Sequence, residues 1–495
     1  MEGHSISWIL FGAYAVTVSL VAVWSRRKAQ SMESFSVGTR TVSPFLVGLS
    51  LAANLTSAAT FVINPGLIYL YGWAGVLGYS VATPLGIFLA LIVFSKKFRR
   101  IGDKTRVITV PQWIGDRFGD ARLTLGFSVL SMLQVTFLVL ITVGLSLVLR
   151  STLGISIPVA LLLVIGFSFV SMLLGGASAH VLNNTIQAGI MITVAVIFLW
   201  SGVQFFEGGI SGFFARLDAV SPHFGSMSNP DSLLFRDWFE VFVANFVIGV
   251  AIILQPHVIS KALYLRSERD ANTYLATAVV VSTLFFSILV TGLFARLALS
   301  GEVLKPDMVM ATYIVEQFSP VLRAVVGLGI LAAGFSTMEG ILVALSSIFS
   351  NDFLRNVLPA RVVADESWKR KSLIYARLFL VLLAVVTFVL SWDQILNPSL
   401  SVAMFAQNGV YAVFAASFAP VLIGVFSKRT PTLLVATASL AALAVHFGMY
   451  YGELTMYHNN PAVTAASGLL VSMAILAIGM AFGKRRPSTV EGLGA

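Results

Sequence analysis

An apolar stretch in the second half of the chain carries three polar side chains in close succession. Residues 327–352, GLGILAAGFSTMEGILVALSSIFSND, contain Ser336, Thr337 and Glu339. Hydroxyl and carboxyl groups cost free energy in hydrocarbon, so within a membrane they face the protein interior or a wet cavity and mark functional sites. Hard cations prefer oxygen ligands of this kind. The stretch therefore predicts a buried site that meets a polar or cationic partner.

The composition is that of an integral membrane protein. Of the 495 residues, 57% are hydrophobic and 11% are charged, and there is no cysteine. A soluble domain carries about 25% charged residues. Apolar runs of about 20 residues recur along the chain, and each is long enough to cross a bilayer. The first run lacks the charged segment and cleavage site of a signal peptide, so we expect a retained helix.

Thirteen spanning helices are predicted from these runs, which places the two termini on opposite sides of the membrane. We expect them near residues 5–25, 43–71, 74–97, 122–150, 156–175, 181–204, 236–258, 271–299, 318–350, 372–391, 398–425, 430–450 and 462–482.

The basic residues segregate to one side of this predicted topology. Of the 32 Lys and Arg residues, 26 fall in loops on one side, among them Lys261, Arg266 and Arg269. The positive-inside rule assigns that side to the cytoplasm, so the N-terminus is expected outside and the C-terminus in the cytoplasm. Topology and lipid headgroups then account for the net charge of +10, and no nucleic acid partner is expected.

A second polar cluster lies in the predicted helix 43–71. Its middle, from Ser50 to Thr60, is rich in small and polar residues, and Pro65 and Gly66 follow. Such a segment either packs tightly against another helix or is unwound, so that its free carbonyl groups line a cavity and bind sodium. Because Ser336 and Thr337 offer hydroxyl groups as further ligands, we favour the unwound segment that binds sodium.

These stretches resemble the sodium/solute symporter family, and the resemblance runs over essentially the whole chain. The motifs that carry it are SFSVGTRTVSPFLVGLSLAANLTSAATF, TVPQWIGDRFG, LGGASAHVLNNTIQ, QPHVISKALYL and GILAAGFSTMEGILVALSSIFSND. The resemblance implies one all-α transmembrane domain, 1–495, with a LeuT-type core of two inverted five-helix repeats. The repeats would span 43–204 and 236–425, with an extra helix at 5–25 and two C-terminal helices within 430–482.

The resemblance also implies a principal sodium site and a departure from the family pattern. Sodium would be bound by the carbonyls of Ala52, Leu55 and Ala333 and the hydroxyls of Ser336 and Thr337. Many members carry an aspartate at the position of Asn184, where it supports a second sodium ion or the ion exit route. Glu339 lies on the helix face of Ser336, where members with the second sodium site usually offer a serine.

Our hypothesis is that the carboxylate has moved from one helix to the other, so that Glu339 faces Asn184. With Gly340 beside it, Glu339 would hold a second cation or titrate as a proton-coupling group. The alternative is a buried neutral Glu339, hydrogen-bonded to Asn184 or Gln187.

The solute site is expected near the midplane, where polar residues of several core helices meet. The candidates are Asn54, Ser57, Thr60, Tyr79, Gln255, His257, Gln407 and Asn408. Pro256 interrupts the hydrogen-bond ladder of its helix. His257 is either a gating or hydrogen-bonding residue or a histidine satisfied by a backbone carbonyl. The pocket lacks the acidic and glutamine residues of the sugar branch, and aliphatic residues replace the aromatic ones of the proline branch.

The resemblance therefore implies a sodium-coupled symporter that imports a small organic anion, such as a monocarboxylate or a pantothenate-like compound, by alternating access. The alternatives are a sodium/proline-type amino acid or sugar symporter, or a transporter-like membrane sensor. We expect a protein of the plasma membrane, a bacterial inner membrane, that works as a monomer in membrane lipid. No enzyme motif, such as a Walker A loop, a nucleophile elbow or HExxH, is present.

Overall fold

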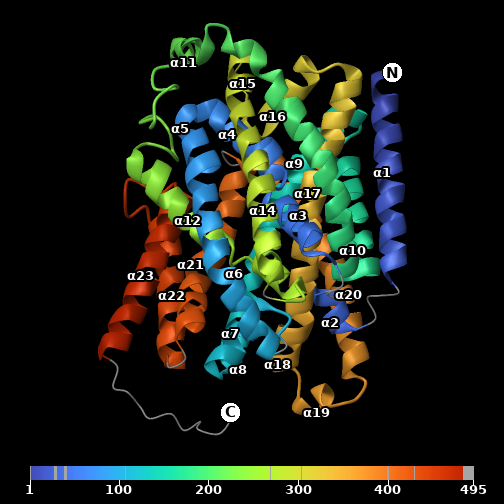
Figure 1. The fold of residues 1–495 in the computed structure, drawn as a ribbon, viewed down its shortest axis with the longest axis vertical. Coiled ribbons are helices and arrows are strands. Elements are labelled where there is room, and N and C mark those ends of the chain that lie inside the picture. Colours follow the sequence, from blue (N-terminus) through green and yellow to red (C-terminus); the bar gives the residue numbers. More distant parts are fainter. Residues whose placement is uncertain are drawn as a thin grey trace.

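The computed structural model describes residues 2–26, 31–37, 42–105, 107–267, 269–302, 304–397, 401–427 and 430–482, and throughout these ranges the regular structure is helical (Figure 1). Several cations of the charge count, including those at 484–486, lie outside the described residues. The first described residue and the end of the last helix lie at opposite ends of the bundle (Figure 1).

The helices of the first half are α1 (Glu2–Arg26), α2 (Met32–Val37), α3 (Pro44–Leu55), α4 (Asn64–Tyr71), α5 (Trp73–Val76), α6 (Thr83–Thr105), α7 (Val110–Phe118), α8 (Ala121–Ser131), α9 (Val135–Leu153), α10 (Ile157–Ser201) and α11 (Gly209–Val220). Those of the second half are α12 (Asn245–Ile252), α13 (Pro256–Ile259), α14 (Asp270–Ser287), α15 (Thr291–Ala298), α16 (Pro306–Gln317), α17 (Pro320–Ile348), α18 (Arg355–Val357), α19 (Ala360–Val363), α20 (Trp368–Leu396), α21 (Val402–Phe426), α22 (Thr432–Tyr451) and α23 (Pro461–Phe482). Short π and 3-10 segments extend several of them, including η1 (Ala59–Ile63), η5 (Phe239–Ala244) and η6 (Ser260–Tyr264).

Within the described residues, the predicted count of thirteen spans is confirmed. Eleven helices are long and apolar enough to cross a membrane, and two bent pairs add the remaining spans. The bent pairs are 44–71, with a bend of 49°, and 239–264, with a bend of 57°. Each bent span opens one of the two predicted repeats, whose boundaries at 43–204 and 236–425 stay a prediction.

The first break is produced by side chains that take over the hydrogen bonds of the backbone. Helix α3 ends at Leu55, and Thr56 adopts an extended conformation with φ −116° and ψ 109°. The Thr56 hydroxyl donates to the Ala52 carbonyl over 2.8 Å, and the Ser57 hydroxyl accepts from the Ala59 amide over 3.1 Å. Such local side-chain bonds compete with the helix, so the chain unwinds here and restarts at η1.

A glycine divides α10 into its two spans. Gly176 has φ 53° inside this long helix, a conformation that favours glycine. A Cβ atom at this position would lie 2.6 Å from the ring of Phe35 in α2. The missing side chain therefore permits both the kink and the close approach of α2. Spans Ile157–Ala177 and Ala179–Phe206 result from this kink.

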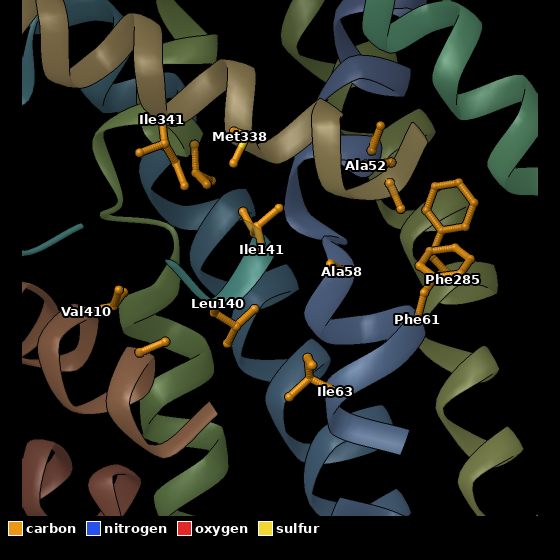
Figure 2. Close-up of a cluster of buried hydrophobic side chains, with 14 of the residues drawn as sticks. Ala52, Ala58, Phe61, Ile63, Leu140, Ile141, Phe285, Met338, Ile341 and Val410 are labelled. Carbon is orange, nitrogen blue, oxygen red and sulfur yellow. The ribbon is translucent and has the colours of Figure 1, made fainter. Parts of the chain in front are cut away.

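Apolar side chains from several helices enclose the first break. Figure 2 shows Ala58 between Ala52, on one half of the broken span, and Ile63, on the other. The buried cluster around them includes Phe61, Leu140, Ile141, Phe285, Met338, Ile341 and Val410. Helix α17 contributes an almost continuously buried segment from Gly329 to Val343. The polar atoms of the break are therefore separated from lipid by packed hydrocarbon.

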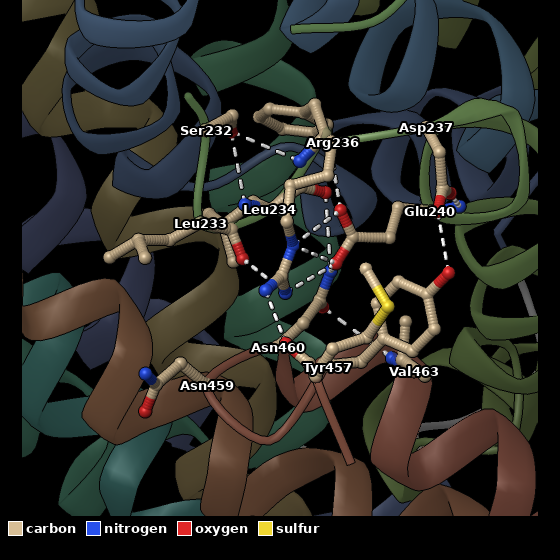
Figure 3. A network of polar contacts seen from close by, with 12 residues as sticks. Ser232, Leu233, Leu234, Arg236, Asp237, Glu240, Tyr457, Asn459, Asn460 and Val463 are labelled. Atoms are coloured by element: carbon tan, nitrogen blue, oxygen red, sulfur yellow. Dashed lines mark hydrogen bonds and ion pairs between the residues drawn. The ribbon is translucent and has the colours of Figure 1, made fainter. Parts of the chain in front are cut away.

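A buried ion pair fastens the last two helices to the second broken span. Arg236 Nη2 lies 2.7 Å from Glu240 Oε1, and the Glu240 side chain is fully buried. Asn460, directly before α23, donates to the same carboxylate over 3.0 Å, and Tyr457 donates to Asp237 (Figure 3). The loop before α23 is therefore attached to the start of η5 through a carboxylate that has no contact with water.

We expect Arg236→Met to destabilise the protein by about 3–5 kcal/mol, because it leaves the buried Glu240 carboxylate without its cation. The matched control is Arg216→Met, which removes the partner of Glu207 in a pair whose side chains are 41% and 82% exposed. An exposed pair is worth about 0–1 kcal/mol. Thermal unfolding in detergent measures both, and equal melting temperatures for the two variants would contradict the expectation.

Candidate functional site

The first break presents to helix α17 backbone carbonyl groups that have no partner within their own helix. Ala52 and Leu55 lie in the last turn of α3, where the final four carbonyl groups have no partner within the helix. Ala52 accepts the Thr56 hydroxyl and is fully buried. Because a free carbonyl at membrane depth needs a donor or a cation, this turn is suited to bind an ion.

The hydroxyl groups of α17 meet this turn directly. Ser336 Oγ lies 2.8 Å from the carbonyl oxygen of Ala53 and 2.7 Å from that of Ala333. Thr337 Oγ1 donates to the Asn54 carbonyl over 3.1 Å. Both hydroxyl side chains are fully buried. The structure therefore brings together the two elements of the predicted sodium site, with their oxygen atoms facing one another.

Asn54 joins the two broken spans. Its Nδ2 donates to the carbonyl of His257, in the short helix after the second break, over 3.1 Å. Its Oδ1 would lie 2.7 Å from a Cβ atom placed on Gly340, so the missing side chain of this glycine makes room for the amide. One side chain therefore contacts both breaks and the helix that carries the hydroxyl pair.

A cavity of about 110 Å³ opens beside the first break. Six of the predicted solute residues line it: Asn54, Ser57, Thr60, Tyr79, Gln255 and Gln407. Apolar side chains form most of the remaining wall: Leu55, Ile87, Phe137, Leu140, Ile252, Phe286, Leu289, Val410 and Phe414. No lining residue, all of them within the described chain, carries a charge. The cavity thus combines an apolar body with a few amide and hydroxyl groups.

Two predicted solute residues lie elsewhere. His257 lines a narrow separate pocket with His180 and Gly340, beyond the second break. Asn408 donates to the Tyr451 hydroxyl over 2.8 Å, and its carbonyl lies 2.9 Å from His446 Nε2. It therefore faces α22, whereas its neighbour Gln407 faces the cavity and contacts Tyr79 over 3.5 Å.

The hypothesis that Glu339 faces Asn184 is wrong, because the preceding residue, Asn183, contacts the carboxylate instead. Asn183 Nδ2 lies 3.3 and 3.4 Å from the two carboxylate oxygens of Glu339. Asn184 instead donates to the Ser50 carbonyl over 3.2 Å. Gln187, the other predicted partner, donates to Tyr14 over 2.8 Å. Glu339 is fully buried, as expected, but a different face of α10 meets it.

Two basic side chains that the sequence analysis did not assign to the site complete this region. Lys261, in η6, is fully buried, and its Nζ lies 2.6 Å from Ser50 Oγ and 3.1 Å from His180 Nε2. The other ring nitrogen of His180 lies 3.7 Å from Glu339 Oε2. The charge count had placed Lys261 in a loop. A histidine inside the apolar run 157–201 was the available signal, since ionisable groups within spans mark functional sites.

The fold and the site together define a class of protein. Broken helices that cross near a midplane cavity, with free carbonyl and hydroxyl oxygens beside it, are the architecture of secondary transporters with a LeuT-type core. The structure agrees: it resembles a Na⁺-coupled sialic acid symporter in its substrate-bound outward-open state with a TM-score of 0.80, at 17% identity, over 97% of this chain and 98% of that one.

The sodium:solute symporter family model matches residues 35–433, so the chain belongs to this family. It is 26% identical to the sodium/pantothenate symporter of Haemophilus influenzae over 424 residues, which is 83% of this chain and 84% of the relative. It is also 26% identical to the sodium/pantothenate symporter of Escherichia coli over 497 residues, 96% of each chain. The protein is therefore a multi-pass membrane transporter, with sodium as its coupling ion.

Single cysteines test the assignment of side chains to the cavity, because the natural chain has none. We expect Gln407→Cys and Thr60→Cys to react with a small water-soluble thiol reagent, since both positions line the cavity. Asn408→Cys is the matched control, because its side chain faces α22 and does not line the cavity. Faster labelling at 408 than at 407 would show that the cavity is assigned to the wrong face of α21.

Proposed function

We propose that this symporter imports a small organic anion with an aliphatic body, a monocarboxylate or a pantothenate-like compound, together with sodium. The observation that carries the proposal is the cavity beside the first break, with its apolar wall and its hydroxyl and amide groups. A sugar would need hydrogen-bond partners on all sides, because unpaired polar groups are costly when buried. An aliphatic solute with one polar end fits this lining better.

The negative end of the solute is proposed to lie near Ser57 and Thr60. The second half of the broken span begins here, and the N-terminal end of a helix favours negative charge. Ser57, Ala59 and Thr60 all line the cavity. Gln255, at the second break, is 6% exposed, and its Oε1 has no hydrogen-bond partner among the described residues. Its amide oxygen is therefore available to accept a hydrogen bond from a hydroxyl or amide group elsewhere on the solute.

Sodium is proposed to bind at Ala52, Leu55, Ala333, Ser336 and Thr337. The hydroxyl groups of α17 already lie against the carbonyls of the broken span, so a cation at this place would hold the two elements together. Leu55 also lines the solute cavity, which puts the proposed ion and the solute on adjacent sides of one turn. This adjacency allows sodium and solute to stabilise the same conformation of that turn.

The orientation proposed for the protein follows from the distribution of its cations. The N-terminus lies outside and the C-terminus in the cytoplasm, in a bacterial inner membrane. Relatives from Haemophilus and Escherichia support the bacterial assignment. One chain contains both broken spans and the whole cavity, which supports a monomer as the working unit in membrane lipid.

Uptake into proteoliposomes tests the proposed substrate class. The panel contains pantothenate, acetate, pyruvate, lactate, proline, a hexose and sialic acid, each with an inward sodium gradient and with a proton gradient alone. We expect sodium-driven accumulation of a carboxylate and none in liposomes without protein. Accumulation of proline or the hexose would overturn the substrate class but not the coupling ion, and the absence of any transport would favour a membrane sensor.

The sodium site is tested by hydroxyl removal. We expect Ser336→Ala and Thr337→Ala each to lower the sodium affinity by about tenfold to a hundredfold, because a bond to a charged group is worth about 1.5–3 kcal/mol. Sodium-induced protection against heat measures the affinity without a substrate. Ser346→Ala is the matched control on the same helix, since its hydroxyl contacts only the carbonyls of Leu342 and Val343. An unchanged affinity in both site variants would exclude this site.

A further inference from the structure

Four of the core elements converge on a buried polar cluster behind the proposed sodium site. It consists of Ser50 in α3, His180 in α10, Lys261 in η6 and Glu339 in α17. All four residues are at most 1% exposed. This is the region in which the family resemblance implies a second cation, and it is separate from the solute cavity, whose lining includes none of these side chains.

The cluster already contains a cation, because Lys261 reaches it from the second broken span. The ammonium group lies 2.6 Å from Ser50 Oγ, to which it donates, and 3.1 Å from His180 Nε2. An ammonium group has only donors, so His180 Nε2 must be its acceptor and the ring proton lies on Nδ1. That nitrogen faces Glu339 Oε2 at 3.7 Å. The His180 ring thus lies between the ammonium and the carboxylate, bonded to the first and 3.7 Å from the second, too far for a hydrogen bond.

The polar groups around the cluster contact one another through their donors, while the amide oxygens of Asn183 and Asn184 have no hydrogen-bond partner among the described residues. Asn184, at the position where many members carry an aspartate, directs its amide nitrogen to the Ser50 carbonyl. Ser171 and Asn183 both lie against the Glu339 carboxylate, at 3.5 and 3.3 Å. The cluster thus holds one cation and one anion on opposite sides of a neutral ring. A sodium ion added to it would bring an unbalanced positive charge into a low-dielectric interior.

We propose that the ammonium group of Lys261 occupies the second cation position of this transporter, so that each cycle carries a single sodium ion. The inference rests on the proposed function for the principal site only. The chain supplies the second cation covalently, through a side chain of the broken span, and Glu339 is the counter-charge of that ammonium. Of the two cation positions, only the principal one then exchanges its ion with the solution, because the second is filled by a side chain.

Counting bound sodium tests the proposal, with purified full-length protein and radioactive sodium. We expect the natural protein to bind one sodium ion, with a Hill coefficient of about 1. In Lys261→Met the Glu339 carboxylate, with the hydroxyl groups of Ser50 and Ser171, becomes available to a cation, so two ions should bind. Lys261→Met with Glu339→Gln removes both charges and should return the count to one.

The outcomes distinguish a failure of this inference from a failure of the proposed function. Two ions bound by the natural protein, or one ion bound by folded Lys261→Met, would overturn the proposal that Lys261 occupies the second cation position. Either result would leave the proposed sodium symport unaffected. No sodium bound by the natural protein would overturn both. Lys261→Arg keeps a cation at the position and should keep the count at one; a second ion in that variant would also refute the proposal. A purely structural lysine would never yield a gain of one ion.

Discussion

The structure depends on backbone carbonyl groups that have no helical partner in the middle of a membrane. Each such group would cost several kcal/mol in hydrocarbon. At the first break the cost is met by side chains: Thr56 bonds back to Ala52, and the hydroxyls of Ser336 and Thr337 reach Ala53 and Asn54. The position of α17 against α3 is therefore set by the same two hydroxyl groups, of Ser336 and Thr337, that are proposed to bind sodium.

The requirement for local charge neutrality explains the polar groups farther from the break. Lys261 and Glu339 are both fully buried and lie on opposite sides of the His180 ring, so each lowers the cost of the other's charge without a direct bond. The Arg236 and Glu240 pair near η5 obeys the same rule at the edge of the bundle. Buried charges of either sign cost much more alone than as a bonded pair.

Helix number, the two breaks and the hydroxyl pair could be predicted from the sequence, because each depends on local composition. Which face of a helix meets which neighbour could not. Asn183 and Asn184 differ by about 100° around α10, and so do Gln407 and Asn408 around α21. Their orientation depends on packing and on the kink at Gly176, which only the folded chain determines.

Lys261 was misplaced for a related reason. The predicted span ended at residue 258, so the lysine was counted among loop cations, whereas the chain continues through η6 to Tyr264 inside the protein. The break at Gln255 shortens the first half of this span, and the second half then extends the buried segment. Apolar length alone therefore underestimated where this second broken span ends, whereas the first was predicted at 43–71 and found at 44–71.

Asn54 shows how the two breaks act as one unit. Its carbonyl accepts the Thr337 hydroxyl of α17, its amide holds the His257 carbonyl, and its side chain lines the solute cavity. A cation that drew the α17 hydroxyls toward itself would change the partner of the Asn54 carbonyl, and this residue would transmit the change to the second broken span. Sodium and solute then need no direct contact, because both bias the position of one residue that belongs to the wall of each site.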